Sequence, residues 1–187
     1  MWLSAEQSLI RETLRAFAQE RLAPHAARWD REHHFPRAEL AALGELGALG
    51  IVVPERWGGA GLDYLSLAVA LEEIGAGDGA VSTIVSVQNS VVCGPLNAFG
   101  TDAQKERFLV PLARGEALGC FCLSEPQVGS DAGAIATRAH RDGDFFVLNG
   151  VKQFITTGKN AAVAVVFAVT DKAAGKKGIS AFLVPTS

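Results

Sequence analysis

The chain has 187 residues, of which 49% are hydrophobic and 20% are charged, and its formal net charge is -3. This composition excludes collagen-like and disordered chains, and a mildly acidic protein lacks the basic surface of a dedicated nucleic-acid binder. The length is long for one compact domain and short for two, because domains commonly have about 100–150 residues. We therefore expect either one large domain or a complete domain followed by part of another.

Neither membrane insertion nor secretion is predicted. The most apolar stretch, residues 161–169, is much shorter than the ~20 residues that a membrane-spanning helix requires. The N-terminus has no basic region followed by an apolar block, so we expect no secretory signal. Cys120 and Cys122 are separated by one residue, which we interpret as opposite faces of a strand, and this spacing suits neither a disulfide framework nor a zinc site. We expect these two residues and Cys93 to be small buried hydrophobic residues in a reducing compartment, and we predict no metal site.

The first part of the chain predicts helices. Ser4 and Gln7 have the spacing of a capping box, and Pro24 is expected to end or kink the helix that they begin. Pro36 is expected as the first residue of a second helix that stops at Gly50. Hydrophobic residues at helical intervals predict two more helices, one with Leu67, Leu71 and Ile74 and one with Val81, Ile84, Val85, Gln88 and Val92. Thr101 and Gln104 have the spacing of a second capping box.

After Gly115 the sequence has the character of strands. Residues 118–124 alternate, and residues 161–169 and 179–184 predict two further strands joined by a loop. The dipeptide Asn149-Gly150 predicts a hairpin between strands at 145–148 and 151–156. Residues 141–144 predict another turn. Helices followed by strands, without alternation, predict an α+β fold. We expect an N-terminal all-α helical domain at 1–117 and a truncated antiparallel, barrel-like β domain at 118–187.

Two segments of the β part have residues that could bind a ligand. In the segment 121–131, FCLSEPQVGSD, a strand is expected to end at Glu125 and to open into a loop where Gly129 lets backbone approach a ligand closely. Such a loop can hold a phosphate through its N–H groups, although the same residues are typical of an ordinary turn. No G-x-G-x-x-G fingerprint is present. The segment 152–158 presents the ring of Phe154 and the hydroxyl of Thr156, or is simply a half-exposed hairpin strand.

Together, the strings CLSEPQVGSDAG and LNGVKQFIT strongly resemble the acyl-CoA dehydrogenase family. PERWGGAGLDY, LEEIG and QKERFLVPLARGE resemble the same family, so the similarity covers almost the whole chain and is greatest to the short-chain (butyryl-CoA) branch. This resemblance implies an N-terminal helical domain, a middle β domain and a C-terminal helical domain, with FAD bound between the β domain and the helices.

The resemblance also implies which residues bind the cofactor and the substrate. Ser124 is expected to hydrogen-bond the polar edge of the flavin ring, and Thr156 to bond near N5. Ser130 resembles both a pyrophosphate contact and a contact to the CoA thioester, and Phe154 stands where many relatives have Trp. The full set of cofactor-binding residues implied by the resemblance is Phe121, Cys122, Leu123, Ser124, Gly129, Ser130, Phe154, Ile155 and Thr156.

The implied activity is the α,β-dehydrogenation of a short-chain acyl-CoA to a trans-2-enoyl-CoA, as in fatty-acid β-oxidation, with electrons passing to an electron-transferring flavoprotein. The catalytic glutamate of this family lies in its C-terminal domain, so we name no catalytic residue and expect the 187-residue chain alone to be inactive. Glu125 is expected to accept backbone N–H groups, and Glu72 and Glu73 to lie on the solvated face of a helix.

Two other interpretations remain open: a non-catalytic flavin-binding or partner-pairing module, and an acyl-CoA oxidase-like enzyme. The strand at 179–184 cannot close a barrel alone, so we expect its edge to be open to pairing or aggregation. Members of the family are commonly homo-oligomers. We expect a cytoplasmic location in a bacterium, or the mitochondrial matrix in a eukaryote, and neither a nucleic-acid partner nor a membrane span.

Overall fold

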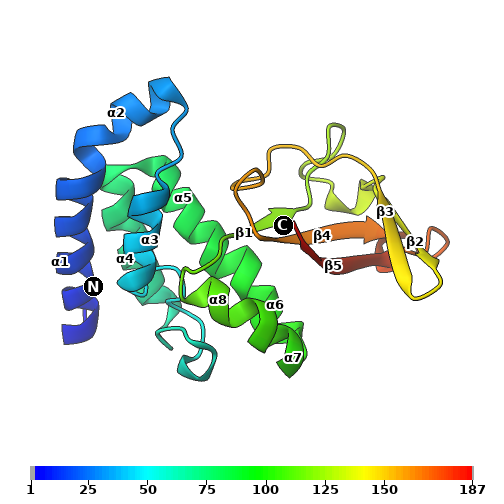
Figure 1. The fold of residues 1–187 in the computed structure, drawn as a ribbon, viewed down its shortest axis with the longest axis horizontal. Helices are drawn as coiled ribbons and strands as arrows, with labels where there is room; N and C mark the ends of the chain where they lie inside the picture. Colours follow the sequence, from blue (N-terminus) through cyan, green and yellow to red (C-terminus); the bar gives the residue numbers. More distant parts are fainter. Residues whose placement is uncertain (1–2, 187) are drawn as a thin grey trace. The chain divides into compact units, whose positions relative to one another are not determined.

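The computed structural model describes residues 3–186 of the chain. Helices occupy the first part and strands the second, which confirms the predicted α+β fold (Figure 1). Contacts divide the chain into two compact units that meet between Ala117 and Leu118, a helical unit and a β unit. None of the helices within 3–186 combines the length and the apolar character needed to cross a membrane.

The helical unit begins with a capped helix, as predicted. The Ser4 hydroxyl accepts a hydrogen bond from the Gln7 N–H at 3.1 Å, and the Gln7 side chain accepts one from the Ser4 N–H at 3.1 Å. The capping box at Thr101 and Gln104 is also confirmed. The helices are α1 (Ala5–Phe17), α2 (Ala23–Glu32), α3 (Arg37–Glu45), α4 (Tyr64–Gly77), α5 (Gly79–Val87), α6 (Gly94–Phe99), α7 (Asp102–Gln104) and α8 (Val110–Ala113), with a 3₁₀ turn at Glu55–Trp57. Two further 3₁₀ turns, at Ala132–Ala134 and Gly175–Gly178, lie in the β unit.

Three helical runs contain a widened, π-helical segment. These segments are Ala18–Leu22, Gln88–Cys93 and Lys105–Leu109, and each ends two residues before a proline. A proline has no N–H, and its ring clashes with the carbonyl four residues earlier, so a wider turn accommodates it within a continuing helix. Pro24 therefore bends the first helix into α2 and does not end it (Figure 1).

The core of the helical unit contains one charged contact that differs from the prediction. Glu72 is exposed as expected, but Glu73 is 6% exposed and accepts two hydrogen bonds from Arg15, at 2.6 and 2.9 Å. The prediction for Glu73 was wrong because α4 packs against α1, which brings the Arg15 guanidinium over this carboxylate. The hydrogen bond from Arg15 lowers the pKa of Glu73, against the effect of burial.

The β unit is a five-stranded mixed sheet. Its strands are β1 (Gly119–Cys122), β2 (Arg138–Asp142), β3 (Phe145–Asn149), β4 (Val163–Val169) and β5 (Ile179–Pro185). β4 pairs in parallel with β1 along one edge and antiparallel with β5 along the other. At its C-terminal end β4 also meets β2, in parallel, so the expected antiparallel sheet is in fact mixed. The long connection between β1 and β4, which contains the β2–β3 hairpin, makes parallel pairing feasible.

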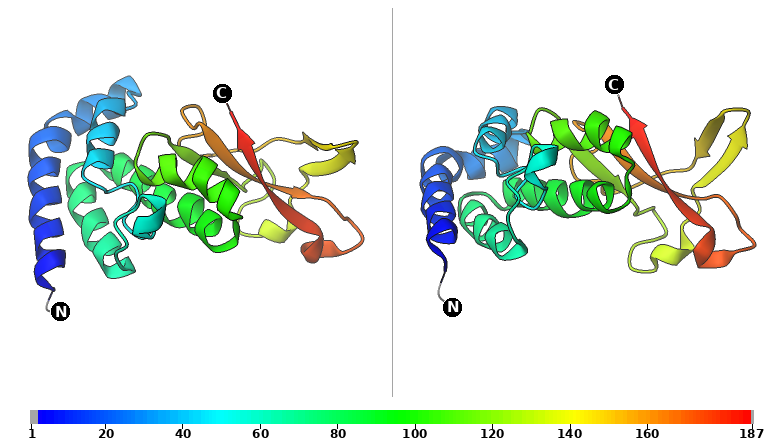
Figure 2. Two further views of the ribbon diagram at one scale, coloured as in Figure 1. Left: turned by 60° about the horizontal axis from the view of Figure 1, so that its bottom comes forward. Right: turned by 90° about the horizontal axis from the view of Figure 1, so that it is seen from below.

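The hairpin of this sheet forms at the turn predicted for residues 141–144, and not at Asn149-Gly150, where the hairpin was expected. β2 and β3 pair from Arg138↔Asn149 to Asp142↔Phe145, so the two-residue turn is Gly143-Asp144, and Gly143 has a φ of +58°. Figure 2 shows this hairpin at the end of the β4–β5 ladder. The chain after Asn149 does not return as a strand, so the strand predicted at 151–156 is wrong.

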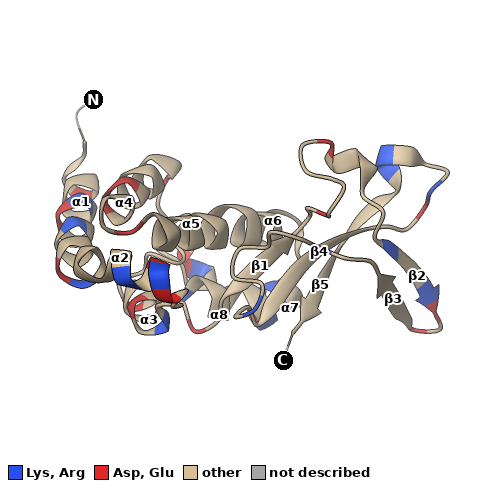
Figure 3. Ribbon diagram, turned by 90° about the horizontal axis from the view of Figure 1, so that it is seen from above, with Lys and Arg blue, Asp and Glu red and all other residues tan. Residues whose placement is uncertain are grey.

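The central strands of the sheet are apolar. β4 and β5 carry no charged residue, and the charges of this unit lie on the hairpin and the loops (Figure 3). On β1, the sulfur atoms of Cys120 and Cys122 lie 3.6 Å apart and share a buried cluster with Ala164. Their predicted placement on opposite faces was wrong, because residues two apart on a strand lie on the same face. All three cysteines are free and buried, as predicted.

Candidate functional site

The first candidate segment leaves β1 through a tight turn. Glu125 and Val128 exchange two backbone hydrogen bonds, at 2.9 and 3.0 Å, with Pro126 as the second residue of the turn, a position that its fixed φ favours. Val128 is buried, whereas Gly129 and Ser130 beyond it are exposed. The strand thus ends in a loop whose anchor is buried and whose tip is open to solvent.

Glu125 is the best-buried carboxylate of this loop, with 2% of its side chain exposed. It accepts hydrogen bonds from the N–H groups of Ala136 at 2.6 Å and Thr137 at 3.0 Å, from the Gln127 amide at 2.8 Å and from the Lys152 ammonium at 2.8 Å. Its predicted role as a backbone acceptor is therefore confirmed. Burial alone would raise the pKa of Glu125, but the hydrogen bonds from Lys152 and these backbone groups outweigh burial and lower it to about 2.

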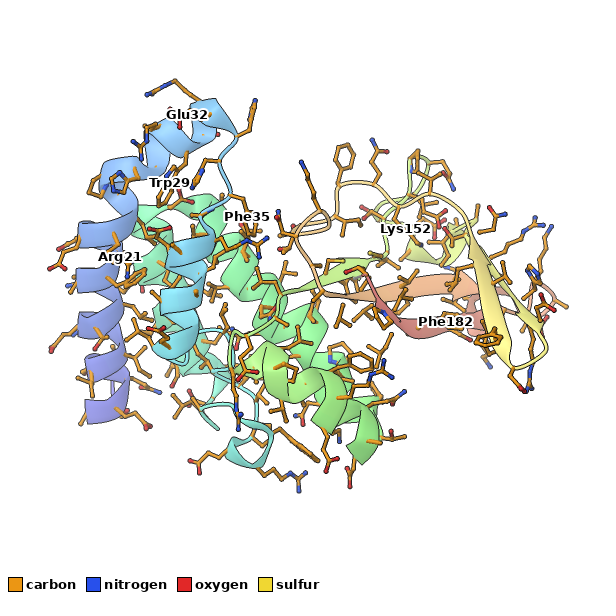
Figure 4. All side chains as sticks on the ribbon, viewed as in Figure 1. Arg21, Trp29, Glu32, Phe35, Lys152 and Phe182 are labelled. Atoms are coloured by element: carbon orange, nitrogen blue, oxygen red, sulfur yellow. The ribbon has the colours of Figure 1, made fainter. Side chains whose placement is uncertain are left out.

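Lys152, labelled in Figure 4, lies on the chain between β3 and β4, and its hydrogen bonds join the two candidate segments. Its ammonium donates to the Leu123 carbonyl at 3.1 Å as well as to Glu125, and only 11% of the side chain is exposed. The next residue, Gln153, donates its N–H to the Ser124 carbonyl at 2.9 Å. The sequence predicted both segments, but it gave no signal that Lys152 would bind across them, 27 residues from Glu125.

The second segment is an irregular loop, although a strand was expected there. Phe154 has a φ of +57° and an exposed ring, and Thr157 has a φ of +65°. A left-handed backbone is costly for bulky and β-branched residues, and such conformations gather at ligand-binding sites. Ile155 anchors the loop by packing against the cluster of Cys120 and Cys122. The Thr157 hydroxyl is buried and has no hydrogen-bond partner among the described residues.

The predicted site residues therefore fall into two groups. Phe121, Leu123 and Ser124 are half-buried on or just after β1, and Phe121 alternates with the inward-facing Cys120 and Cys122. Because the Cys122 side chain lies in the core cluster, a ligand contact from this residue would come from its backbone. The remaining residues lie on the two loops: Gly129 and Ser130 on the first, and Phe154, Ile155 and Thr156 on the second.

The chemistry of these groups suits a planar, polar-edged cofactor with a phosphate tail. Hydroxyls of Ser124 and Thr156 and the orphaned Thr157 hydroxyl provide polar groups, and the exposed ring of Phe154 provides an apolar face. A Cβ at Gly129 would meet no protein atom within 4 Å, so space remains at this backbone for a ligand. Within residues 3–186, no group of three or more His, Cys, Asp or Glu side chains could hold a metal ion.

Comparison with known proteins gives matches along the whole chain. Residues 4–116 match the model of the acyl-CoA dehydrogenase N-terminal domain, and residues 120–187 match that of the middle domain. The chain is 50% identical over 183 residues to the human mitochondrial short-chain specific acyl-CoA dehydrogenase, covering 98% of this chain and 44% of that protein.

Solved structures agree with these matches. Butyryl-CoA dehydrogenase from Megasphaera elsdenii superposes with a TM-score of 0.95 at 37% identity, covering 100% of this chain and 50% of that one. A glutaryl-CoA dehydrogenase from Mycobacterium smegmatis in complex with FADH2 superposes with a TM-score of 0.91 at 39% identity, covering 99% of this chain and 46% of that one. The chain thus spans about half the length of these relatives. Taken with the motifs and the fold, the matches show that the chain belongs to the acyl-CoA dehydrogenase family.

Proposed function

We propose that this chain provides the flavin-binding strand and loops of an FAD-dependent acyl-CoA dehydrogenase that acts on short-chain acyl-CoA. The observation that carries the proposal is the direct connection between the segments 121–131 and 152–158 through Lys152 and Gln153. Membership of the family and the identity to a short-chain specific enzyme support both the cofactor and the substrate class.

In this proposal each residue group has a distinct task. Phe121, Leu123 and Phe154 shield the flavin ring from water, and the hydroxyls of Ser124 and Thr156 hydrogen-bond its polar edge. Gly129 and Ser130 hold the pyrophosphate, and Ser130 also contacts the thioester. FAD, when bound, supplies the acceptor for the β-hydride of the substrate.

We assign no catalytic base to the described residues. Glu125 is unsuited to removing the α-proton, because it is buried, ion-paired and held ionised by four hydrogen-bond donors. Glu73 is likewise paired with Arg15. We therefore infer that the base comes from a helical domain outside these residues and that the chain alone binds flavin without turning over substrate.

Further parts of the proposal concern the setting of the enzyme. The electrons pass to an electron-transferring flavoprotein, the enzyme assembles as a homo-oligomer, and it acts in fatty-acid β-oxidation in a bacterial cytoplasm or a mitochondrial matrix. The alternative is a non-catalytic module that pairs with another chain. It has the same fold, but a flavin bound to it would not be reduced by acyl-CoA.

An absorbance experiment tests the proposal. The purified chain is mixed with FAD, freed of unbound flavin by gel filtration, and scanned before and after addition of butyryl-CoA. We expect a retained flavin band that butyryl-CoA does not bleach, and bleaching when a C-terminal helical domain from a short-chain relative is added. Absence of retained flavin would contradict the proposal, and a flavin band that never bleaches with the added domain would favour the non-catalytic module.

A further inference from the structure

The ion pair between Lys152 and Glu125 is unusually well buried for two charged groups, with 11% and 2% of the side chains exposed. Resting on the proposed function, we propose that Glu125 and Lys152 are positioning residues: they hold the end of β1 and the loop at 153–157 at the separation that flavin contact requires. Neither side chain is required to touch the cofactor.

Stability alone does not account for this pair. Removing two charges from water is expensive, and well-packed apolar residues of similar volume are often as stabilising as a buried ion pair. The ion pair instead fixes how the joined segments are arranged, because its hydrogen bonds are satisfied in only one arrangement. The Lys152 ammonium meets the Leu123 carbonyl and the Glu125 carboxylate, and that carboxylate also receives the N–H groups that precede β2.

The ion pair lies next to both sets of predicted flavin contacts, the one after β1 and the one on the loop at 153–157. Leu123, whose carbonyl Lys152 binds, directly precedes Ser124, and Gln153 returns a hydrogen bond to the Ser124 carbonyl. Phe154 follows immediately, in a left-handed conformation that persists only where the surrounding structure fixes it. Lys152 fixes one side of this loop, and Ile155, packed on the core cluster, fixes the other.

The helical unit supplies a matched control. Arg15 and Glu73 also form a short ion pair around a buried carboxylate, with two hydrogen bonds. This pair joins α1 to α4 within the helical unit, whereas the segments 121–131 and 152–158 belong to the β unit. Removing its charges tests what the loss of such an ion pair does to stability alone.

The experiment compares five proteins: the wild-type chain, Lys152→Met, Lys152→Arg, the double variant Glu125→Gln/Lys152→Met, and the control Arg15→Met/Glu73→Gln. The single change to Met leaves Glu125 buried without its cation and is expected to unfold the β unit in part. The double variant removes both charges together and is expected to stay folded, which circular dichroism checks. Two quantities are then measured: hydrogen exchange at the Gln153 amide, and FAD affinity from flavin fluorescence.

In the double variant we expect faster exchange at Gln153 and a rise of about tenfold in the Kd for FAD, because binding must then fix the backbone of about one additional residue. Lys152→Arg, which keeps the cation, is expected to retain most of both properties, and the control variant to retain both fully. Unchanged exchange at Gln153, or faster exchange with unchanged affinity, would overturn the inference and leave flavin binding intact. If the wild-type chain binds no FAD, the proposed function fails and the inference fails with it.

Discussion

Removing the charges of Glu125 and Lys152 is expected to change how the stability of the β unit depends on pH. The perturbation is the double variant Glu125→Gln/Lys152→Met, which eliminates one carboxylate whose pKa is about 2 in the folded chain against an ordinary value of 4.5. Above pH 4.5 this carboxylate is ionised in both states. Between pH 4.5 and 2 the unfolded chain binds a proton that the folded chain does not, so falling pH favours unfolding.

The size of this change in the free energy of unfolding follows from the lowered pKa of Glu125. At about 1.4 kcal/mol per pKa unit, the full difference corresponds to about 3 kcal/mol. The two side chains are only 11% and 2% exposed, so solvent screens the pair little, and we expect a contribution of about 2–3 kcal/mol. The wild type should lose this amount, relative to the double variant, between pH 6 and pH 2. Asp63 and Glu73 also have lowered pKa values, but both residues are present in each protein, so their contributions cancel.

Urea unfolding at several pH values, followed by hydrogen exchange of β4 amides, measures this difference. All tryptophans of the chain precede Gly58, so tryptophan fluorescence reports on the helical unit and provides an internal control that the variant should not alter. A stability difference that does not change between pH 6 and pH 2, or that changes in the opposite direction, would refute the assigned hydrogen bonds of Glu125.

Four further predictions concern the site and the core. Ser124→Ala should raise the Kd for FAD by roughly 2- to 13-fold, the value of one neutral hydrogen bond, while leaving the thermal midpoint unchanged; complete loss of binding in a folded chain would disprove its assigned role. Gly150→Ala should destabilise the β unit by about 1–3 kcal/mol, because the new Cβ would overlap Thr137, whose Cα lies 2.7 Å from it. Gly129→Ala, where a Cβ meets nothing, should leave urea stability within about 0.5 kcal/mol and weaken only FAD binding, and equal destabilisation by the two alanines would contradict this. A thiol reagent should modify Cys93, Cys120 and Cys122 only after denaturation, because all three thiols are buried and burial raises the pKa of Cys93 to about 12. Rapid labelling of the folded chain would contradict this burial.

Features that depend on neighbouring residues were predictable from the sequence. Both capping boxes, at Ser4 and Thr101, form as their spacing predicts, because a cap involves residues only three apart. Glu125 was also predicted as an acceptor of backbone N–H groups, since a carboxylate beside a proline at a strand end has such groups within reach.

Features that depend on distant residues were not predictable. Asn149-Gly150 and Gly143-Asp144 are both good turn sequences, and the choice between them depends on how β2 and β3 pair. Gly150 instead allows the close approach of Thr137. The burial of Glu73 depends on which helix packs against α4, which no local pattern specifies. For the same reason the sequence predicted the two candidate segments but not the hydrogen bonds of Lys152 that connect them.

A hydrogen-exchange map of the chain with and without FAD tests the central claim most directly. If the segments 121–131 and 152–158 form the flavin site, FAD should slow exchange at amides of both segments and leave the amides of α1 and α4 unchanged. Protection confined to other parts of the chain, or to only one of the two segments, would contradict the account.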